Sequence, residues 1–118
     1  RDSSTSRGLG DVYKRQILID TGVLSIGNNA FQDCSGLTSV IIPESVESIG
    51  GNAFRNCSGL TSVTIPSSVS SIGDSAFQDC SSLTGATILG NLHFIGSNAF
   101  SGNNALIYII FDVAAPTV

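Results

Sequence analysis

The sequence is poor in basic residues. Of its 118 residues only 5 are Lys or Arg, and four of these lie in the first 16 positions: Arg1, Arg7, Lys14 and Arg15. From Ile17 onward, the single basic residue Arg55 stands against seven Asp and Glu residues, which gives a formal charge of −6. One cation cannot neutralise a phosphate backbone, so nucleic acid is not expected as a partner. Anionic membrane surfaces are disfavoured for the same reason.

The patterns of catalytic and metal sites are also missing. The sequence has no nucleophile elbow and no phosphate-binding loop. Its one histidine, His93, occupies a position expected to face solvent, and its three cysteines include no Cys-x-x-Cys pair. No apolar run reaches the length of a membrane span. We therefore expect no enzymatic activity, no metal or cofactor, and no membrane insertion by this segment.

One pattern, Ala-Phe-x-x-Cys-x-x-Leu, recurs along the chain at an interval of 23 residues. The same interval separates the members of three columns: Phe31, Phe54, Phe77 and Phe100; Ile26, Ile49, Ile72 and Ile95; Cys34, Cys57 and Cys80. A fixed period of this length predicts a solenoid, in which each coil stacks on the next and none folds alone.

Each coil has a predicted strand followed by a return side. Leu60, Val63 and Ile65 have the spacing of a leucine-rich repeat strand, with Val63 and Ile65 on one face. Pro66 has no amide proton and should end the pairing. Val69 and the isoleucine column form a second apolar pair on the return side.

The coil is completed by a tight segment. Gly73 is expected at a turn where a side chain would obstruct the backbone. Ala76, Phe77 and Cys80 have the spacing of a single helical turn packed inward. The cysteines should then form a buried ladder of structural thiols, because stacked parallel side chains are poorly oriented for a disulfide and their number is odd.

This repeat resembles the BspA-like leucine-rich repeats, also called the Treponema pallidum type, whose signature is roughly L-x-x-(V/I)-x-(I/L)-P-x-x-(V/L)-x-x-I-G-x-x-A-F-x-x-C. The match is nearly complete over residues 37–57 and 60–80, and it extends from Ile17 to about Phe111. Later coils depart from it at Ala86, Leu89, Asn103 and Asp112. The resemblance implies a mainly β repeat solenoid with 23-residue coils, short strands on two sides and one-turn helical segments.

Residues 1–16 do not follow the repeat, and the register begins abruptly at Ile17. Asp11 to Gln16 match the translation GAT-GTG-TAT-AAG-AGA-CAG of a common transposase adapter, so we interpret residues 1–16 as a non-native tail that is disordered. The alternative is a genuine basic N-terminus. Residues 17–118 are then a fragment of a longer solenoid, with about four repeats of which the first and last are incomplete.

The outward side of the predicted strands is the candidate binding surface. Position 64 and its counterparts form a column flanked by Tyr108, and we name these six residues the strand face: Leu18, Ile41, Thr64, Thr87, Tyr108 and Ile110. A mixed apolar and hydroxyl stripe with few charges is typical of protein-binding surfaces. The alternative is that short β-branched residues simply favour strands.

Two functions remain open. The resemblance implies an interaction module of a bacterial surface or secreted protein, with adhesion to host extracellular-matrix or plasma proteins as the sharper form of this hypothesis. It also implies an extracellular or cell-surface location. The alternative is a set of structural spacer repeats in a larger protein, with no ligand of their own.

Overall fold

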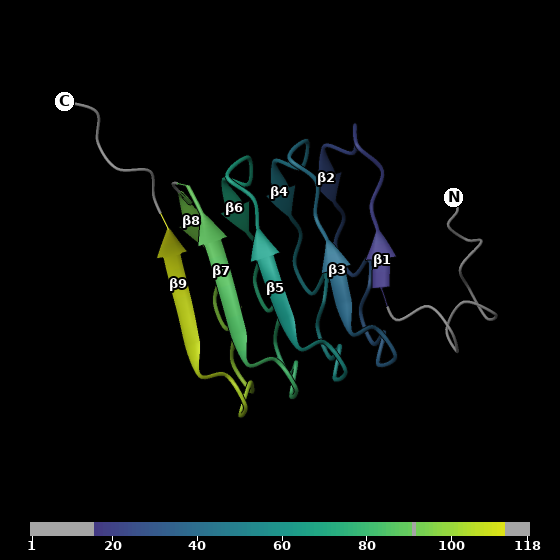
Figure 1. Cartoon of the computed structure of the whole chain (residues 1–118), viewed down its shortest axis with the longest axis vertical. Coiled ribbons are helices and arrows are strands. Elements are labelled where there is room, and N and C mark those ends of the chain that lie inside the picture. The colour runs from purple at the N-terminus through teal and green to yellow at the C-terminus, as the bar shows by residue number, and fades with distance from the viewer. Residues whose placement is uncertain (1–15, 91, 113–118) are drawn as a thin grey trace.

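The structure, a computed structural model, describes residues 16–90 and 92–112, which form two rows of short strands joined by turns (Figure 1). One side of each coil carries the longer strands: β1 (Gln16–Leu18), β3 (Ser39–Ile41), β5 (Ser62–Ile65), β7 (Gly85–Leu89) and β9 (Tyr108–Asp112). The other side carries two-residue strands: β2 (Ser25–Ile26), β4 (Ser48–Ile49), β6 (Ser71–Ile72) and β8 (Phe94–Ile95).

All strand pairs in the described part of the chain are parallel and join residues one repeat apart. On the short-strand side, a single sheet runs β2-β4-β6-β8, with Ile26 paired to Ile49. On the long-strand side, the pairs form two sheets, β1-β3 and β5-β7-β9, with Ser62 opposite Gly85. This confirms the predicted β-solenoid with 23-residue coils and short strands on two sides, and the structure adds that the strands pair in parallel.

The core lies between the two rows of strands. Val63 and Ile65 enter it from the long-strand side, and Val69 and Ile72 enter it from the return side, all of them buried. The phenylalanine column continues through the coils as an offset ring stack, with centroids 5.2, 5.1 and 5.3 Å apart for Phe31–Phe54, Phe54–Phe77 and Phe77–Phe100. Each coil therefore completes the burial of its neighbour, as the repeat predicts.

The predicted one-turn helical segments are wrong: the described chain contains strands and turns and no helix. In the second coil, the N–H of Ala53 bonds within the turn to the Gly50 carbonyl, whereas the N–H groups of Asn52 and Phe54 bond to carbonyls of the next coil at 2.9 and 2.7 Å. Asn52 has a φ of 60°. A helix needs successive internal bonds and negative φ angles. Here alternate amides instead bond to the neighbouring coil.

Gly73 is required by close packing between coils. A Cβ atom at this position would lie 2.5 Å from the Gly51 nitrogen and 2.7 Å from the Gly50 carbonyl carbon. Its φ is not in the left-handed region, so backbone proximity, rather than a special turn conformation, excludes a side chain.

The interpretation of residues 1–16 stays a prediction, because residues 1–15 lie outside the described part of the chain. Gln16 is described and begins β1, where its backbone lies opposite Ser39 and its side chain is exposed. The regular pairing therefore includes one residue before the expected boundary. Backbone pairing of this kind does not require a repeat-specific side chain.

Candidate protein-binding face

The structure places all six strand-face residues on the outward side of the longer strands. Leu18 lies opposite Ile41, and Thr64, Thr87 and Ile110 follow in register across β5, β7 and β9. Leu18 is 71% exposed, while Ile41 and Ile110 are each 48% exposed. The apolar members thus present much of their surface to solvent even though the sheet supports them from below.

On this face, the ring of Tyr108 packs over a glycine of the neighbouring strand. It lies directly opposite Gly85 on β7, and a Cβ atom built on Gly85 would come within 2.6 Å of the tyrosine hydroxyl oxygen. The ring therefore covers the glycine, as aromatic residues do when they pack over a strand glycine. It remains 49% exposed. The earlier strands carry Gln16, Ser39 and Ser62 at the position of Gly85, so the arrangement is confined to the β7–β9 pair.

The long-strand side is interrupted in its middle. Within the described chain, β1 pairs with β3 and β5 pairs with β7, but no strand pairing joins β3 to β5. Their coils are linked just before these strands, where the Thr61 N–H bonds to the Thr38 carbonyl at 3.1 Å. The short-strand sheet on the other side has no such interruption.

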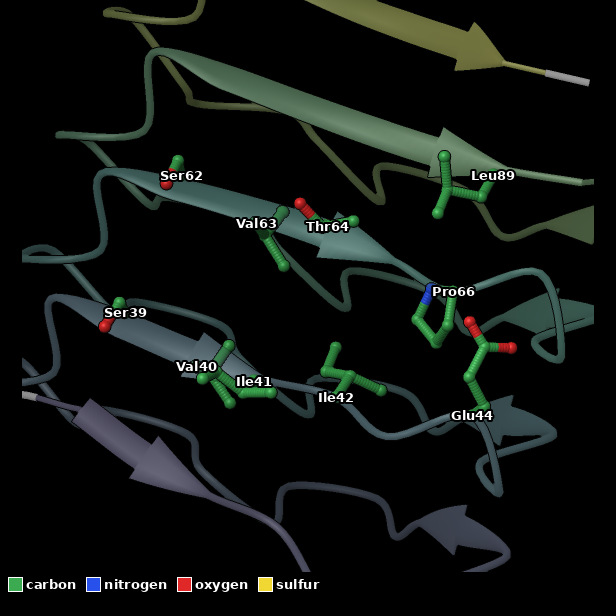
Figure 2. A pocket seen from close by; sticks show the side chains of 10 residues that line it. All are labelled: Ser39, Val40, Ile41, Ile42, Glu44, Ser62, Val63, Thr64, Pro66 and Leu89. Atoms are coloured by element: carbon green, nitrogen blue, oxygen red, sulfur yellow. The ribbon is translucent and has the colours of Figure 1, made fainter. Parts of the chain in front are cut away.

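A hollow of about 260 Å³ occupies this interruption (Figure 2). Figure 2 shows Ser39 and Ser62 at one end, and Glu44, Pro66 and Leu89 gathered where the strands end. Buried Val40, Ile42 and Val63 form its base, and Ile41 and Thr64 of the strand face lie beside it: the full lining is Ser39, Val40, Ile41, Ile42, Glu44, Ser62, Val63, Thr64, Pro66 and Leu89.

Glu44 supplies the only charge among the residues that line the hollow. Its side chain is exposed, and its Oε1 accepts a hydrogen bond from the Ser67 hydroxyl at 3.2 Å. A carboxylate therefore lies beside the apolar surfaces of Pro66 and Leu89. No residue pattern in the sequence indicates this hollow, because a missing strand pairing leaves no such pattern.

Threonines next to the strand face, just before the long strands, have a structural role. The Thr61 hydroxyl donates to the Thr38 carbonyl at 3.3 Å, and the Thr84 hydroxyl donates to the Thr61 carbonyl at 3.2 Å. These threonines reinforce the stacking of successive coils. Their recurrence is explained by the fold and gives no support to a ligand.

The cysteine ladder is internal to the fold. Cys57 and Cys80 are buried thiols whose Sγ atoms lie 3.1 Å from the carbonyl oxygens of Phe31 and Phe54. Burial is the main cause that raises the pKa of Cys57 to about 12 and that of Cys80 to about 11. Cys34 is half buried. A neutral buried thiol is a poor nucleophile and metal ligand, so the ladder acts in packing.

A second hollow, of about 540 Å³, lies along the opposite edge of the coils beside Phe94. Two of its polar side chains accept hydrogen bonds from backbone amides of the next coil. Asn28 Oδ1 accepts one from the Gly51 N–H at 2.8 Å, and Asp74 Oδ1 accepts one from the Ser97 N–H at 2.9 Å. His93 is exposed, and its backbone N–H bonds to the Ser70 carbonyl. No group of three or more metal-ligating side chains is found among the described residues.

The parallel coils, the 23-residue register and the stacked phenylalanines define a leucine-rich repeat solenoid. The sequence model of the BspA type leucine rich repeat region matches residues 13–115. The chain belongs to this family. No curated protein matches it. In the described residues, no helix is long and apolar enough for a membrane span.

Two solved structures are similar to this chain. A leucine-rich repeat protein from Bacteroides ovatus ATCC 8483 is 35% identical over 78% of this chain, with a TM-score of 0.69. The chain spans 24% of that protein's length. A leucine rich cell surface protein from Faecalibacterium prausnitzii A2-165 is 21% identical, with 82% of this chain and 41% of that chain covered and a TM-score of 0.42.

Proposed function

We propose that this segment binds a protein through the strand face. The observation that carries the proposal is the exposure of large apolar side chains, above all Ile41, Tyr108 and Ile110, on a supported and nearly uncharged surface. Tyrosine and aliphatic side chains of this kind anchor protein interfaces. A solenoid holds them on one rigid surface, and successive coils can add weak contacts.

The family resemblance and the charge support a choice of partner class. We propose host extracellular-matrix and plasma proteins as the partners, because such proteins are accessible to a bacterial protein that is secreted or displayed on the cell surface. The formal charge of −6 after residue 16 favours partners with a neutral or basic contact surface.

The test uses the whole chain, immobilised, and a panel of extracellular-matrix and plasma proteins. Ile41→Glu and Ile110→Glu each introduce a charge into the strand face, whereas Phe94→Glu introduces the same charge at an exposed aromatic residue on the short-strand side. We expect the first two to weaken binding by at least about tenfold, because a charge at an interface centre must be desolvated. Phe94→Glu should leave it unchanged.

Spacer repeats are the second candidate, and the threonine hydroxyl bonds between coils favour them, because they give Thr61 and Thr84, which lie just before the long strands, a role in stacking. Failure of the intact chain to bind any protein of the panel would support the spacer function. Loss of binding only in Phe94→Glu would move the interface to the other side of the solenoid.

A further inference from the structure

We propose that the hollow between β3 and β5 receives the side chain of one lysine or arginine from the protein that binds the strand face. This inference rests on the proposed function and adds the chemistry of the contact. The location supports it: Ile41 and Thr64, two members of the strand face, lie at the hollow, so a partner lying across the strand face passes over it.

The interrupted pairing gives the hollow polar groups. Where β5 and β7 lie side by side, their backbones are paired from Ser62–Gly85 to Ile65–Ile88. No equivalent pairing joins β3 to β5 in the described chain, so backbone groups along these two strands are left for other partners. Unpaired donors and acceptors at a strand edge readily accept a ligand's polar groups.

The size and the walls fit a single long side chain. A volume of about 260 Å³ is below the range of roughly 300–1,000 Å³ that encloses small-molecule ligands. Val40 and Val63 line the base, and Pro66 and Leu89 line one end, so most of the enclosed surface is apolar. Lys and Arg side chains match such a site, because their methylene stems pack on apolar surface while the charged head stays polar.

The charge of the site selects a cation. Glu44 lies at the end of the hollow, and its carboxylate keeps an acceptor oxygen beyond the Oε1 that is bonded to Ser67. The rest of the lining is neutral, and the segment after residue 16 carries a net negative charge. A cationic head beside Glu44 would form a charge-assisted hydrogen bond. An acidic side chain would be repelled.

The experiment titrates the ¹⁵N-labelled chain with two capped tripeptides, acetyl-Ala-Lys-Ala-amide and acetyl-Ala-norleucine-Ala-amide, which share the stem and differ in the charged head. Titration to about 20 mM exceeds the roughly millimolar Kd expected of one anchored side chain. We expect the lysine peptide to shift amide signals of Ile41, Val63 and Thr64. The norleucine peptide should bind about threefold to tenfold more weakly.

Glu44→Gln should reduce binding of the lysine peptide to the norleucine level, since the amide keeps an acceptor for Ser67 and loses the charge. Glu47→Gln is the matched control, an exposed glutamate on the far side of the turn just before β4. The inference would be overturned if the lysine and norleucine peptides bound equally well, or if the lysine peptide shifted no amide signals in β3 and β5. It would also be overturned if Glu44→Gln and Glu47→Gln weakened binding of the lysine peptide equally. If Ile110→Glu weakened binding of a panel protein and Glu44→Gln did not, the result would reject the hollow between β3 and β5 as a lysine or arginine site and would still support binding through the strand face.

Discussion

Replacing Phe77 by Ala should remove a large share of the stability of the coil stack. Its side chain is fully buried, and its ring lies between those of Phe54 and Phe100 at centroid distances of 5.1 and 5.3 Å. Phe-to-Ala replacements in protein cores cost about 3–5 kcal/mol. Each lost aromatic pair adds about 0.5–1.5 kcal/mol beyond burial. We therefore expect a loss at the upper end, about 4–5 kcal/mol.

Two other phenylalanines provide a graded comparison. Phe100 is half buried and stacks on one ring, that of Phe77, among the described residues, so Phe100→Ala should cost roughly half as much. Phe94 is 56% exposed on the outer side of β8, and Phe94→Ala should change the free energy of unfolding by less than about 0.5 kcal/mol. The three variants remove the same atoms, and only their surroundings differ.

The assay is urea unfolding of the whole chain, followed by far-UV circular dichroism because the sequence has no tryptophan. Since coils are coupled only to their neighbours, hydrogen exchange of Phe77→Ala should also show the residues after β6 opening before those around β3. A loss of less than about 1 kcal/mol for Phe77→Ala, or equal losses for Phe77→Ala and Phe94→Ala, would refute the stacked core.

The remaining predictions concern the glycine column, the thiols and the tail. Gly73→Ala should cost about 1–3 kcal/mol by overpacking, while Gly27→Ala, where a Cβ atom would meet nothing within 4 Å, should be nearly neutral; equal thermal shifts would contradict the close approach of coils. Cys57 and Cys80 should react with a thiol reagent only after unfolding. Their pKa values are raised from 9.0 to about 12 and about 11, so the folded state binds more protons and stability should fall as the pH rises from 9 towards 12. If the Cys57→Ala, Cys80→Ala double variant lost stability over this pH range as steeply as the unmodified protein, the pH dependence would come from groups other than these two thiols. Deleting residues 1–15 should change the free energy of unfolding by less than about 0.5 kcal/mol, and a drop of several degrees in the melting temperature would reject the adapter interpretation.

The architecture could be predicted from the sequence because the stacking of coils produces columns of residues that recur every 23 positions along the chain. Residues 23 apart occupy equivalent places in neighbouring coils, so a conserved environment in space becomes a repeated residue type along the chain. Phe54 and Phe77 were placed correctly in the core, as were Ile26, Ile49 and Ile72, and Phe31 and Phe100 pack against it. The expectation was wrong for Ile95, which is 41% exposed. The outward positions at Ile41 and Ile110 were placed correctly on the surface. Whether these outward residues bind a protein stays a prediction.

The expected helical turn was wrong for a reason that spacing cannot reveal. An i, i+1, i+4 pattern describes which side chains point inward, and a chain of turns can satisfy it as well as a helix can. The difference lies in the amides: those of Asn52 and Phe54 bond to the next coil, which a local pattern does not encode. The hydrogen bond that Asn103 makes to the preceding coil is likewise not encoded in the local residue pattern. Asn103 replaces the column cysteine, and its Oδ1 accepts the N–H of Cys80 at 2.7 Å.

Fold and candidate function are carried by different positions of the repeat. The recurring residues are buried or bonded between coils, and their environment depends on a neighbour: Ile72 is fully buried, whereas Ile95, its counterpart on β8, the last described short strand, is 41% exposed. The features that could recognise a partner are instead departures from the repeat, such as Ile41 in place of Thr64, Glu44 in place of Ser67, and Tyr108 over Gly85. A change at a recurring position should alter stability first and binding only through it. A change at Ile41 or Glu44 should alter binding while the unfolding curve stays the same, and this separation makes the strand face testable apart from the fold.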